Sequence, residues 1–171
     1  VQRLYGFQHN DGGWGWWFDD ATHDYQTAWV IFGLAQVAEA GYEVDSVVIE
    51  RGAVWLNDNL GRMDARTRAF ALYALAEAGQ PNTEATLNLA ADLDALQGDT
   101  FSLAGLALAL DAIGEDELAG EIVDGLAETA VTNNNNQTHW QGAAHDGHYS
   151  QKTMASDVRN TALALSAFTQ I

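Results

Sequence analysis

The strongest constraint on the fold is a set of apolar segments that recur along the chain. Three of them, residues 33–41, 71–79 and 106–114, end in an acidic residue, small or apolar residues and then Gly. Glycine is favoured there because the residue that ends an α-helix often needs left-handed backbone. A fourth segment, residues 161–171, matches the body of the other three. The repeat of about 35 to 38 residues is typical of stacked helical hairpins.

The repeated segments and the segments between them have different hydrophobic patterns. Residues 28–38, "AWVIFGLAQVA", show no polar face, which predicts a helix buried all the way round. The intervening segments carry one apolar stripe with polar residues on other faces, which predicts amphipathic outer helices. The stripe positions are Leu118, Ile122, Leu126 and Ala130, residues 48–56, and Leu89, Leu93 and Leu96. The expected N-caps are Asp45 or Ser46, Asn82 or Thr83, and Asp116.

The expected fold class is all-α, because strand signals are scarce and helix formers dominate. Two architectures fit: an open α-solenoid, or a closed α/α toroid of the terpenoid cyclase/prenyltransferase type with inner and outer rings. The alternation of buried and half-buried helices favours the toroid, since both helices of a solenoid pair are usually amphipathic. Four buried helices are too few to close the ring, so we expect an incomplete ring that exposes apolar surface at its open end.

Two stretches interrupt the helical pattern, residues 8–24 and 132–152, and both are rich in Gly, Asn or Asp. Both should be loops. The first holds four aromatic residues, Trp14, Trp16, Trp17 and Phe18. One interpretation is an aromatic pocket at the mouth of the toroid that binds sugar rings, a cation or a partner protein. The other is that the Trp side chains pack between helices and anchor the loop.

Both loops also contain potential metal ligands and acids, which form weak patterns. The candidate ligands of the second loop are His139, His145, Asp146 and His148. A mixed cluster in the first loop comprises His9, Asp19, Asp20, His23 and Asp24. Together with Asp11, the first loop's carboxylates also allow a glycosidase-like acid pair, although Asp is common in turns and caps. We expect neither a metal site nor a cofactor.

Composition excludes several classes of partner and chemistry. The chain has seven Lys plus Arg against 24 Asp plus Glu, a formal net charge of −17, which argues against binding nucleic acid or an anionic membrane. The absence of Cys excludes a disulfide framework, a thiolate zinc site and a Cys nucleophile within these residues. No apolar run reaches the roughly 18 residues of a membrane span.

The string "QHNDGGWGWW" carries a family resemblance. Gln8, Gly12 and Trp14 have the spacing of the Q-W motif of α/α toroid proteins, terpene cyclases included. Residues 11–17, followed by the T-A-x-V-x-x-G-L pattern at 27–34 and A-G-Y at 40–42, closely resemble the thioester-containing, complement-like domain of bacterial alpha-2-macroglobulin family proteins. "THWQG" and the later "TALALSAF" resemble the H-W loop and last inner helix of that domain.

The resemblance implies that the chain is part of a broad-spectrum endopeptidase inhibitor rather than an enzyme, and that it lies outside the cytoplasm, in the periplasm or at the cell surface. Residues 1–171 would be a single domain, the C-terminal larger part of the thioester domain. In that family, a protease cleaves a bait region and an internal Cys–Gln thioester then acylates the protease. The G-C-x-E-Q motif is absent here and expected upstream. The implied partners are the other domains of the parent protein and, through the parent, target proteases.

No residue is carried over as catalytic. Some complement relatives use a His that would fall near residues 57–64, where this chain has none, so we expect amine acylation without that relay. We hypothesise that Trp14, Trp16, Trp17 and Tyr25 shield the thioester from water. The alternatives are an α/α toroid enzyme acting on glycans or isoprenoids, and an interaction module without chemistry.

Overall fold

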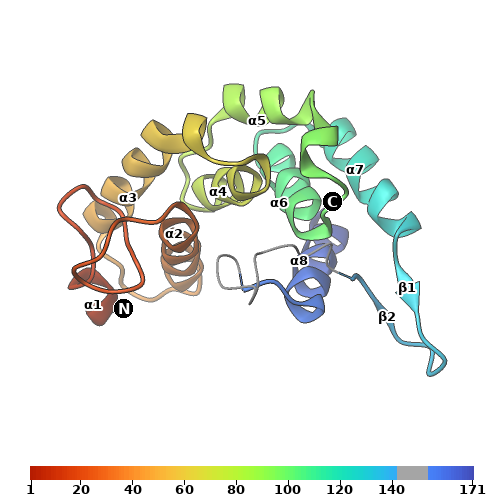
Figure 1. Cartoon of the computed structure of the whole chain (residues 1–171), viewed down its shortest axis with the longest axis horizontal. Coiled ribbons are helices and arrows are strands. Elements are labelled where there is room, and N and C mark those ends of the chain that lie inside the picture. Colours follow the sequence, from red (N-terminus) through yellow and green to blue (C-terminus); the bar gives the residue numbers. More distant parts are fainter. Residues whose placement is uncertain (142–153) are drawn as a thin grey trace.

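The computed structural model describes residues 1–141 and 154–171, and in that part of the chain nearly all regular structure is helical (Figure 1). The α-helices are α1 (Gln2–Tyr5), α2 (Asp24–Glu39), α3 (Ser46–Asn59), α4 (Ala65–Glu77), α5 (Thr83–Ala90), α6 (Thr100–Asp111), α7 (Asp116–Glu128) and α8 (Asp157–Gln170). Two 3₁₀ turns are η1 (Leu60–Arg62) and η2 (Leu93–Leu96), and two short strands are β1 (Val131–Thr132) and β2 (Thr138–His139). The all-α prediction is confirmed.

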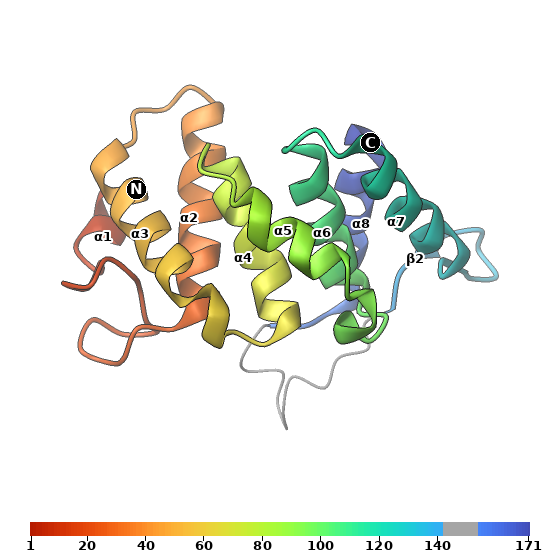
Figure 2. The same ribbon diagram turned by 90° about the horizontal axis from the view of Figure 1, so that it is seen from above.

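The helices form two layers of an arc. Helices α2, α4, α6 and α8 pack side by side in that order and make the inner layer. Helices α3, α5 and α7 cover them on the outer side (Figures 1 and 2). The predicted alternation of inner and outer helices is therefore present, and in the described residues the arc is open rather than closed.

The inner helices run in the same direction. Ring contacts show this, because an early residue of one helix meets an early residue of the next. Tyr25 of α2 packs on Phe70 of α4, with ring centroids 5.6 Å apart. Further along both helices in the chain direction, Phe32 of α2 packs on Tyr73 of α4 at 5.4 Å. Phe70 in turn contacts Phe101, in the first turn of α6, at 5.1 Å. The first turns of the inner helices therefore lie at one edge of the arc.

Burial follows position in the arc. Helices α4 and α6 have neighbours on both sides, and residues such as Leu72 and Leu106 are completely buried. Among the described residues, helix α8 ends the arc and has an inner neighbour on one side only, so Leu163 is buried while Val158 and Leu165 are exposed. The prediction that all four repeated segments are buried is thus correct for the central helices and wrong for much of residues 161–171. It is also wrong in part for the first segment, where Val30 and Phe32 are only half-buried and residues 38–41 are exposed.

The outer helices are amphipathic, but two stripe positions were misplaced. Helix α7 buries Ala119, Ile122, Val123 and Leu126, whereas Leu118 is exposed. Leu93 is also exposed, because α5 ends at Ala90 and the chain turns into η2 before Leu93 could reach the core.

The predicted helix ends are mostly correct. Asp45 and Asn82 cap α3 and α5 by accepting hydrogen bonds from main-chain N–H groups. Asp116 is instead the first residue of α7, and the N-cap position is held by Glu115 without a side-chain bond. The glycines that close the repeats, Gly41, Gly79 and Gly114, all have positive φ, as a left-handed C-cap requires.

The second predicted loop contains a small β-hairpin. Strands β1 and β2 pair antiparallel, with Val131 opposite His139. The adjoining Trp140 is buried, donates from Nε1 to the carbonyl of Leu126 at 2.8 Å, and packs on Phe168. Two-residue strands are too short to leave a sequence pattern. The candidate ligands His145, Asp146 and His148 lie outside the described residues.

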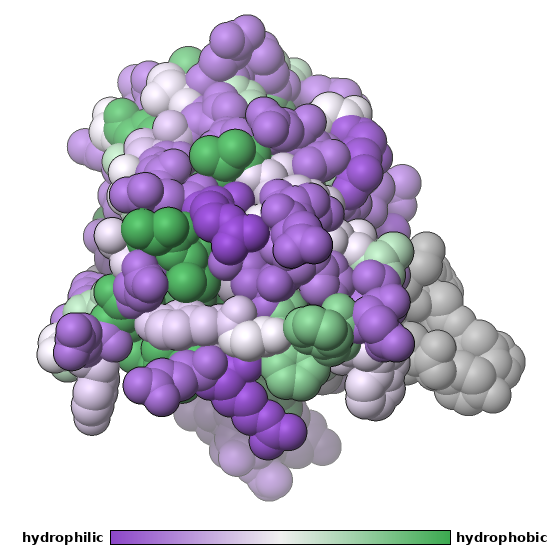
Figure 3. Space-filling model, turned by 90° about the vertical axis from the view of Figure 1, so that its left-hand side faces the viewer, coloured by the Kyte–Doolittle hydropathy of each residue, from purple (hydrophilic) through white to green (hydrophobic). Residues whose placement is uncertain are grey.

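The end of the arc formed by α1 and α3 exposes apolar side chains, as expected for an open ring. Val1, Leu4, Val47 and Val54 are each more than a third exposed. Figure 3 shows apolar surface interspersed with polar side chains on this side of the molecule. Among the described residues, none of the helices combines the length and hydrophobicity needed to cross a bilayer.

The close approach of α3 to α2 gives a testable prediction. A Cβ atom on Gly52 would lie 2.7 Å from Cζ3 of Trp14 and 2.9 Å from Cδ1 of Ile31. Gly52→Ala should therefore destabilise the fold by about 1–3 kcal/mol through overpacking. The matched control is Gly125→Ala in α7, where a Cβ meets nothing within 4 Å, and it should stabilise the helix by up to about 1 kcal/mol. Urea unfolding of the two variants checks this, and equal stability of both would contradict it.

Candidate functional site

The loop before α2, here called the tryptophan loop (residues 8–23), is anchored by Trp14. This side chain is 2% exposed. Its indole N–H donates to the carbonyl of Leu4 at 2.9 Å, and its main-chain N–H donates to Oγ1 of Thr27 at 2.9 Å. The anchoring interpretation is therefore correct for Trp14.

The other aromatic residues of the tryptophan loop face solvent. Trp16, Trp17 and Phe18 are 45%, 71% and 65% exposed. Apolar side chains of this size are usually buried, so three exposed in a row make this loop the candidate contact surface. The functional interpretation of the loop rests on these three residues and not on Trp14.

Asp11 ties the loop to the outer helix α3. Its carboxylate accepts hydrogen bonds from the main-chain N–H of Gly13 at 3.1 Å, the hydroxyl of Thr22 at 2.8 Å and the indole N–H of Trp55 at 3.0 Å. Burial by itself would raise the pKa of Asp11, but these hydrogen bonds and the nearby His9 outweigh it, so the pKa is lowered. Arg51 adds a second tie by donating to the carbonyls of His9 and Asn10.

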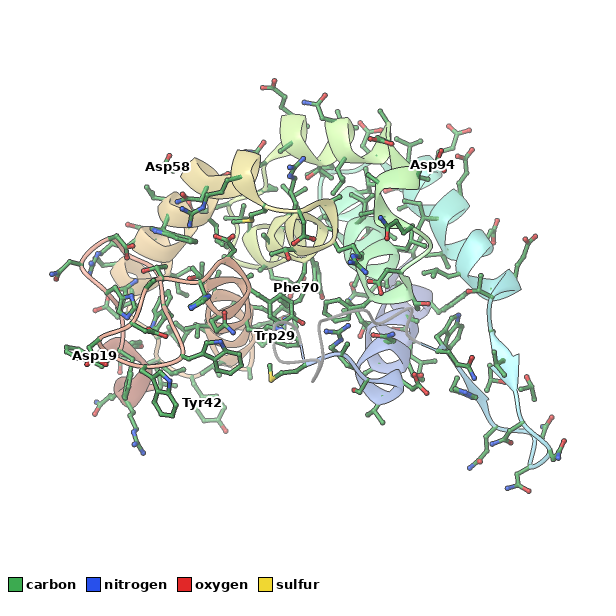
Figure 4. The ribbon with its side chains drawn as sticks, viewed as in Figure 1. Asp19, Trp29, Tyr42, Asp58, Phe70 and Asp94 are labelled. Atoms are coloured by element: carbon green, nitrogen blue, oxygen red, sulfur yellow. The ribbon has the colours of Figure 1, made fainter. Side chains whose placement is uncertain are left out.

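The remaining acids of the loop are engaged in turns and ion pairs. Asp20 accepts from the main-chain N–H of Trp16 at 2.9 Å, and Asp24 pairs with Arg62 at 3.0 Å. Asp19 lies on the exposed outer side of the loop (Figure 4). Within residues 1–141 and 154–171, no three His, Asp or Glu side chains come close enough to hold a metal ion. The mixed cluster predicted from His9 and its neighbours is therefore not a three-ligand metal site.

A second feature, here called the aromatic wall, lines the inner side of the arc. Its members come from the first three inner helices and are Tyr25, Trp29, Phe32, Phe70, Tyr73 and Phe101. Trp29 and Phe70 are in tight contact, with centroids 4.6 Å apart, and both point toward the inside of the arc (Figure 4). Trp29, Phe32 and Tyr73 lie in segments that the sequence identifies as apolar, whereas Tyr25, Phe70 and Phe101 lie just before them. The joint position of the six rings depends on the register between helices.

Arg159 joins the last inner helix to this wall. Its guanidinium lies 4.0 Å from the ring centroid of Phe101, and Nη1 donates to the hydroxyl of Tyr25 at 2.9 Å. Its Nε and Nη2 both donate to Oδ1 of Asn160. Tyr25 therefore belongs to the aromatic wall, where it packs on Trp29 and Phe70, and not to the tryptophan loop.

At the opposite end of the inner helices, polar groups surround Glu77. Burial raises the pKa of Glu77, and the nearby Glu39 raises it further, although Tyr73 and Gln36 donate hydrogen bonds to it. Burial and the same two acids raise the pKa of the Tyr73 hydroxyl. These groups close the far end of the wall with a hydrogen-bonded acidic network.

The structure defines a class of fold: an open arc in which parallel inner helices are covered by outer helices. Solved structures share it. The E. coli alpha-2-macroglobulin spanning domain MG7 to the C-terminus matches 98% of this chain with a TM-score of 0.76 and 21% identity. The Salmonella alpha-2-macroglobulin reacted with methylamine matches 98% with a TM-score of 0.67 and 19% identity.

Sequence comparison points the same way over a shorter stretch. The chain is 44% identical over 54 residues, 32% of its length, to alpha-2-macroglobulin of Thermotoga maritima. No family model matches the chain. It spans 4% of the Thermotoga protein, 26% of the E. coli structure and 12% of the Salmonella structure. The resemblance of this chain to bacterial alpha-2-macroglobulins is confirmed, with the arc corresponding to a small part of those proteins.

The lowered pKa of Asp11 gives a prediction for acid stability. A carboxylate with a depressed pKa in the folded state stabilises the fold above its unfolded pKa of about 4 and loses that contribution as pH falls through the folded pKa. Asp11→Asn should therefore be less stable than the wild type at pH 6, and the difference should shrink by pH 2.5. The exposed Asp58→Asn on α3 is the control (Figure 4). Urea unfolding across this pH range would refute the prediction if the Asp11→Asn difference stayed constant.

Proposed function

We propose that this chain is the C-terminal larger part of the thioester domain of a bacterial alpha-2-macroglobulin-like endopeptidase inhibitor. The observation that carries the proposal is the similarity of fold over 98% of the chain to the C-terminal region of E. coli alpha-2-macroglobulin. The 54-residue stretch shared with the Thermotoga protein supports it independently. On this proposal the chain has a binding and trapping role rather than a catalytic one.

The names of the solved relatives describe chemistry that fits this role. The E. coli protein has been captured as trypsin-activated and elastase-activated forms, and the Salmonella protein after reaction with methylamine. In the proposed reaction, an amine nitrogen attacks the thioester carbonyl, the C–S bond breaks and the Cys leaves as a thiolate. The chain contains no Cys, so the Cys of the parent protein would come from outside these 171 residues.

The aromatic residues have separate roles in this proposal. Trp16 and Trp17 are the exposed residues that cover the thioester, while Trp14 fixes the loop that presents them. Tyr25 contributes through the aromatic wall, with its hydroxyl held by Arg159. An apolar surface that excludes water slows hydrolysis of an activated acyl group. The proposal places this part of the protein outside the cytoplasm, where its partners are the other domains of the parent and the attacking protease.

The first test is amine addition to the full-length protein that carries this chain. Methylamine should add one amide-linked adduct and release one thiol, measured by intact mass and thiol titration. Trimethylamine is the control, because it has no N–H to lose and cannot form an amide. If methylamine gives neither adduct nor thiol, the covalent part of the proposal is wrong.

The second test concerns the exposed tryptophans. Trp17→Ala in the full-length protein should accelerate spontaneous thiol release in buffer, since water gains access to the thioester. Tyr42→Ala is a matched control, because Tyr42 is also 71% exposed but lies between α2 and α3 (Figure 4). Unchanged release rates for alanine variants of Trp14, Trp16, Trp17 and Tyr25 would reject a shielding role.

A further inference from the structure

The imidazole of His9 lies in the middle of the tryptophan loop and faces oxygen atoms on both sides. Its side chain is 11% exposed. Nδ1 lies 2.8 Å from Oγ1 of Thr22, and Nε2 lies 3.2 Å from the carbonyl oxygen of Trp17. Nε2 also lies 3.8 Å from Oδ1 of Asp20. The protonation state of the ring therefore decides how many of these contacts are attractive.

On the Nδ1 side, the Thr22 hydroxyl has one proton, and either Nδ1 of His9 or the carboxylate of Asp11 can accept it. The Thr22 hydroxyl is 2.8 Å from the carboxylate of Asp11, which can only accept a hydrogen bond. If Thr22 donates to Asp11, Oγ1 of Thr22 can only accept a hydrogen bond from His9, so Nδ1 must carry a proton. If Thr22 donates to Nδ1 instead, the Asp11 carboxylate loses one of its three donors.

On the Nε2 side, both neighbours can only accept. A main-chain carbonyl and a carboxylate offer no proton, so this nitrogen must also carry one. Oδ1 of Asp20 is buried without a hydrogen-bond partner, although Oδ2 of the same group accepts from the N–H of Trp16. A buried carboxylate oxygen without a donor is costly, and a cationic ring 3.8 Å away compensates for it.

We propose that His9 is a proton-binding site that latches the tryptophan loop: the imidazolium, donating from both nitrogens, holds residues 16–20 against the body of the loop. The neutral ring has a single N–H. Deprotonation therefore either draws the Thr22 hydroxyl proton away from Asp11, which keeps Gly13 and Trp55 as donors, or leaves the Trp17 carbonyl and Asp20 without a donor from His9. The charged groups around the ring are Asp11, Asp20, Arg51 and the more exposed His23. The Arg51 guanidinium is directed to the main-chain carbonyl of His9.

The latch couples pH to the surface that the loop presents. Trp16 and Trp17 are exposed and lie directly on the segment that His9 and Asp20 hold. The latch is closed when the ring is protonated and opens as pH rises and the proton is lost. The proposal is independent of the proposed function, because it concerns only the order of this loop.

Hydrogen–deuterium exchange of the full chain, read by mass spectrometry on peptides covering residues 14–22, tests the latch. Exchange rates are divided by their intrinsic rates to correct for pH. Protection of these peptides should fall by about fivefold to tenfold between pH 5.5 and pH 8 in the wild type, as a charge-assisted contact is lost. In His9→Gln it should be low and independent of pH.

His23→Gln is the matched control. Its ring lies 3.9 Å from the other oxygen of Asp20 but is 48% exposed, so the variant should keep the wild-type pH dependence. Asp20→Asn keeps an acceptor for the N–H of Trp16 and should at least halve the pH response. A direct readout is ¹⁵N NMR of the His9 ring, which should show both nitrogens protonated at pH 5.5.

Three results would overturn the latch. The first is a neutral His9 ring at pH 5.5 in the folded chain. The second is a wild-type pH dependence in His9→Gln. The third is that added Zn²⁺ restores full protection at pH 8 in the wild type but not in His9→Gln or His23→Gln. That result would make the cluster a metal site instead of a proton site.

Discussion

Close packing between neighbouring inner helices is the interaction on which the rest of the structure depends. It requires small residues where the helices face each other. At Gly105 of α6, a Cβ atom would lie 3.7 Å from the carbonyl oxygen of Ala69 and from Cα of Phe70 in α4, so the two backbones are nearly in contact. Ala69, Ala104 and Ala107 are completely buried in the same region. With the helices this close on one side, large aromatic residues are accommodated on the inner side of the arc, and the aromatic wall is the consequence.

The tryptophan loop depends on the same core. Trp14 lies against Gly52 of α3 and is hydrogen bonded to Thr27 of α2, so the loop is joined to both layers of the arc. From this anchor, Asp11 and Asp20 fix the turns that hold Trp16 and Trp17 at the surface. A flexible loop would let such residues collapse onto the nearest apolar surface. Here a hydrogen-bonded frame keeps them exposed at the surface.

Much of the fold could be predicted from the sequence, because local patterns determine it. The glycines that end the repeats need positive φ, and Asp45 and Asn82 cap helices for reasons contained in a few adjacent residues. Leu118 and Leu93 were misplaced because a one-residue shift in phase, or an early helix end, moves a side chain from core to solvent. Such shifts are set by packing against other helices and leave no local signal.

The site was predicted only in part. The Gly-rich string marks a loop with four aromatic residues, but it does not say which of them are exposed, and the assignment of Trp14 to the core needs the positions of Leu4 and Thr27. The bond between Arg159 and Tyr25 joins residues at opposite ends of the chain and has no signature in either segment. Likewise, the contacts of the His9 ring with Thr22 and with the carbonyl of Trp17 depend on how the loop folds in three dimensions.

The central proposal is that this arc belongs to a protein that traps proteases covalently. The most direct test is to incubate the full-length protein with trypsin and to analyse the products under denaturing conditions by mass spectrometry. The account predicts a conjugate in which a Lys amine of trypsin is joined to a Gln side-chain carbonyl of the inhibitor by an amide bond. Recovery of all the trypsin unmodified and freely active on protein substrates would contradict it.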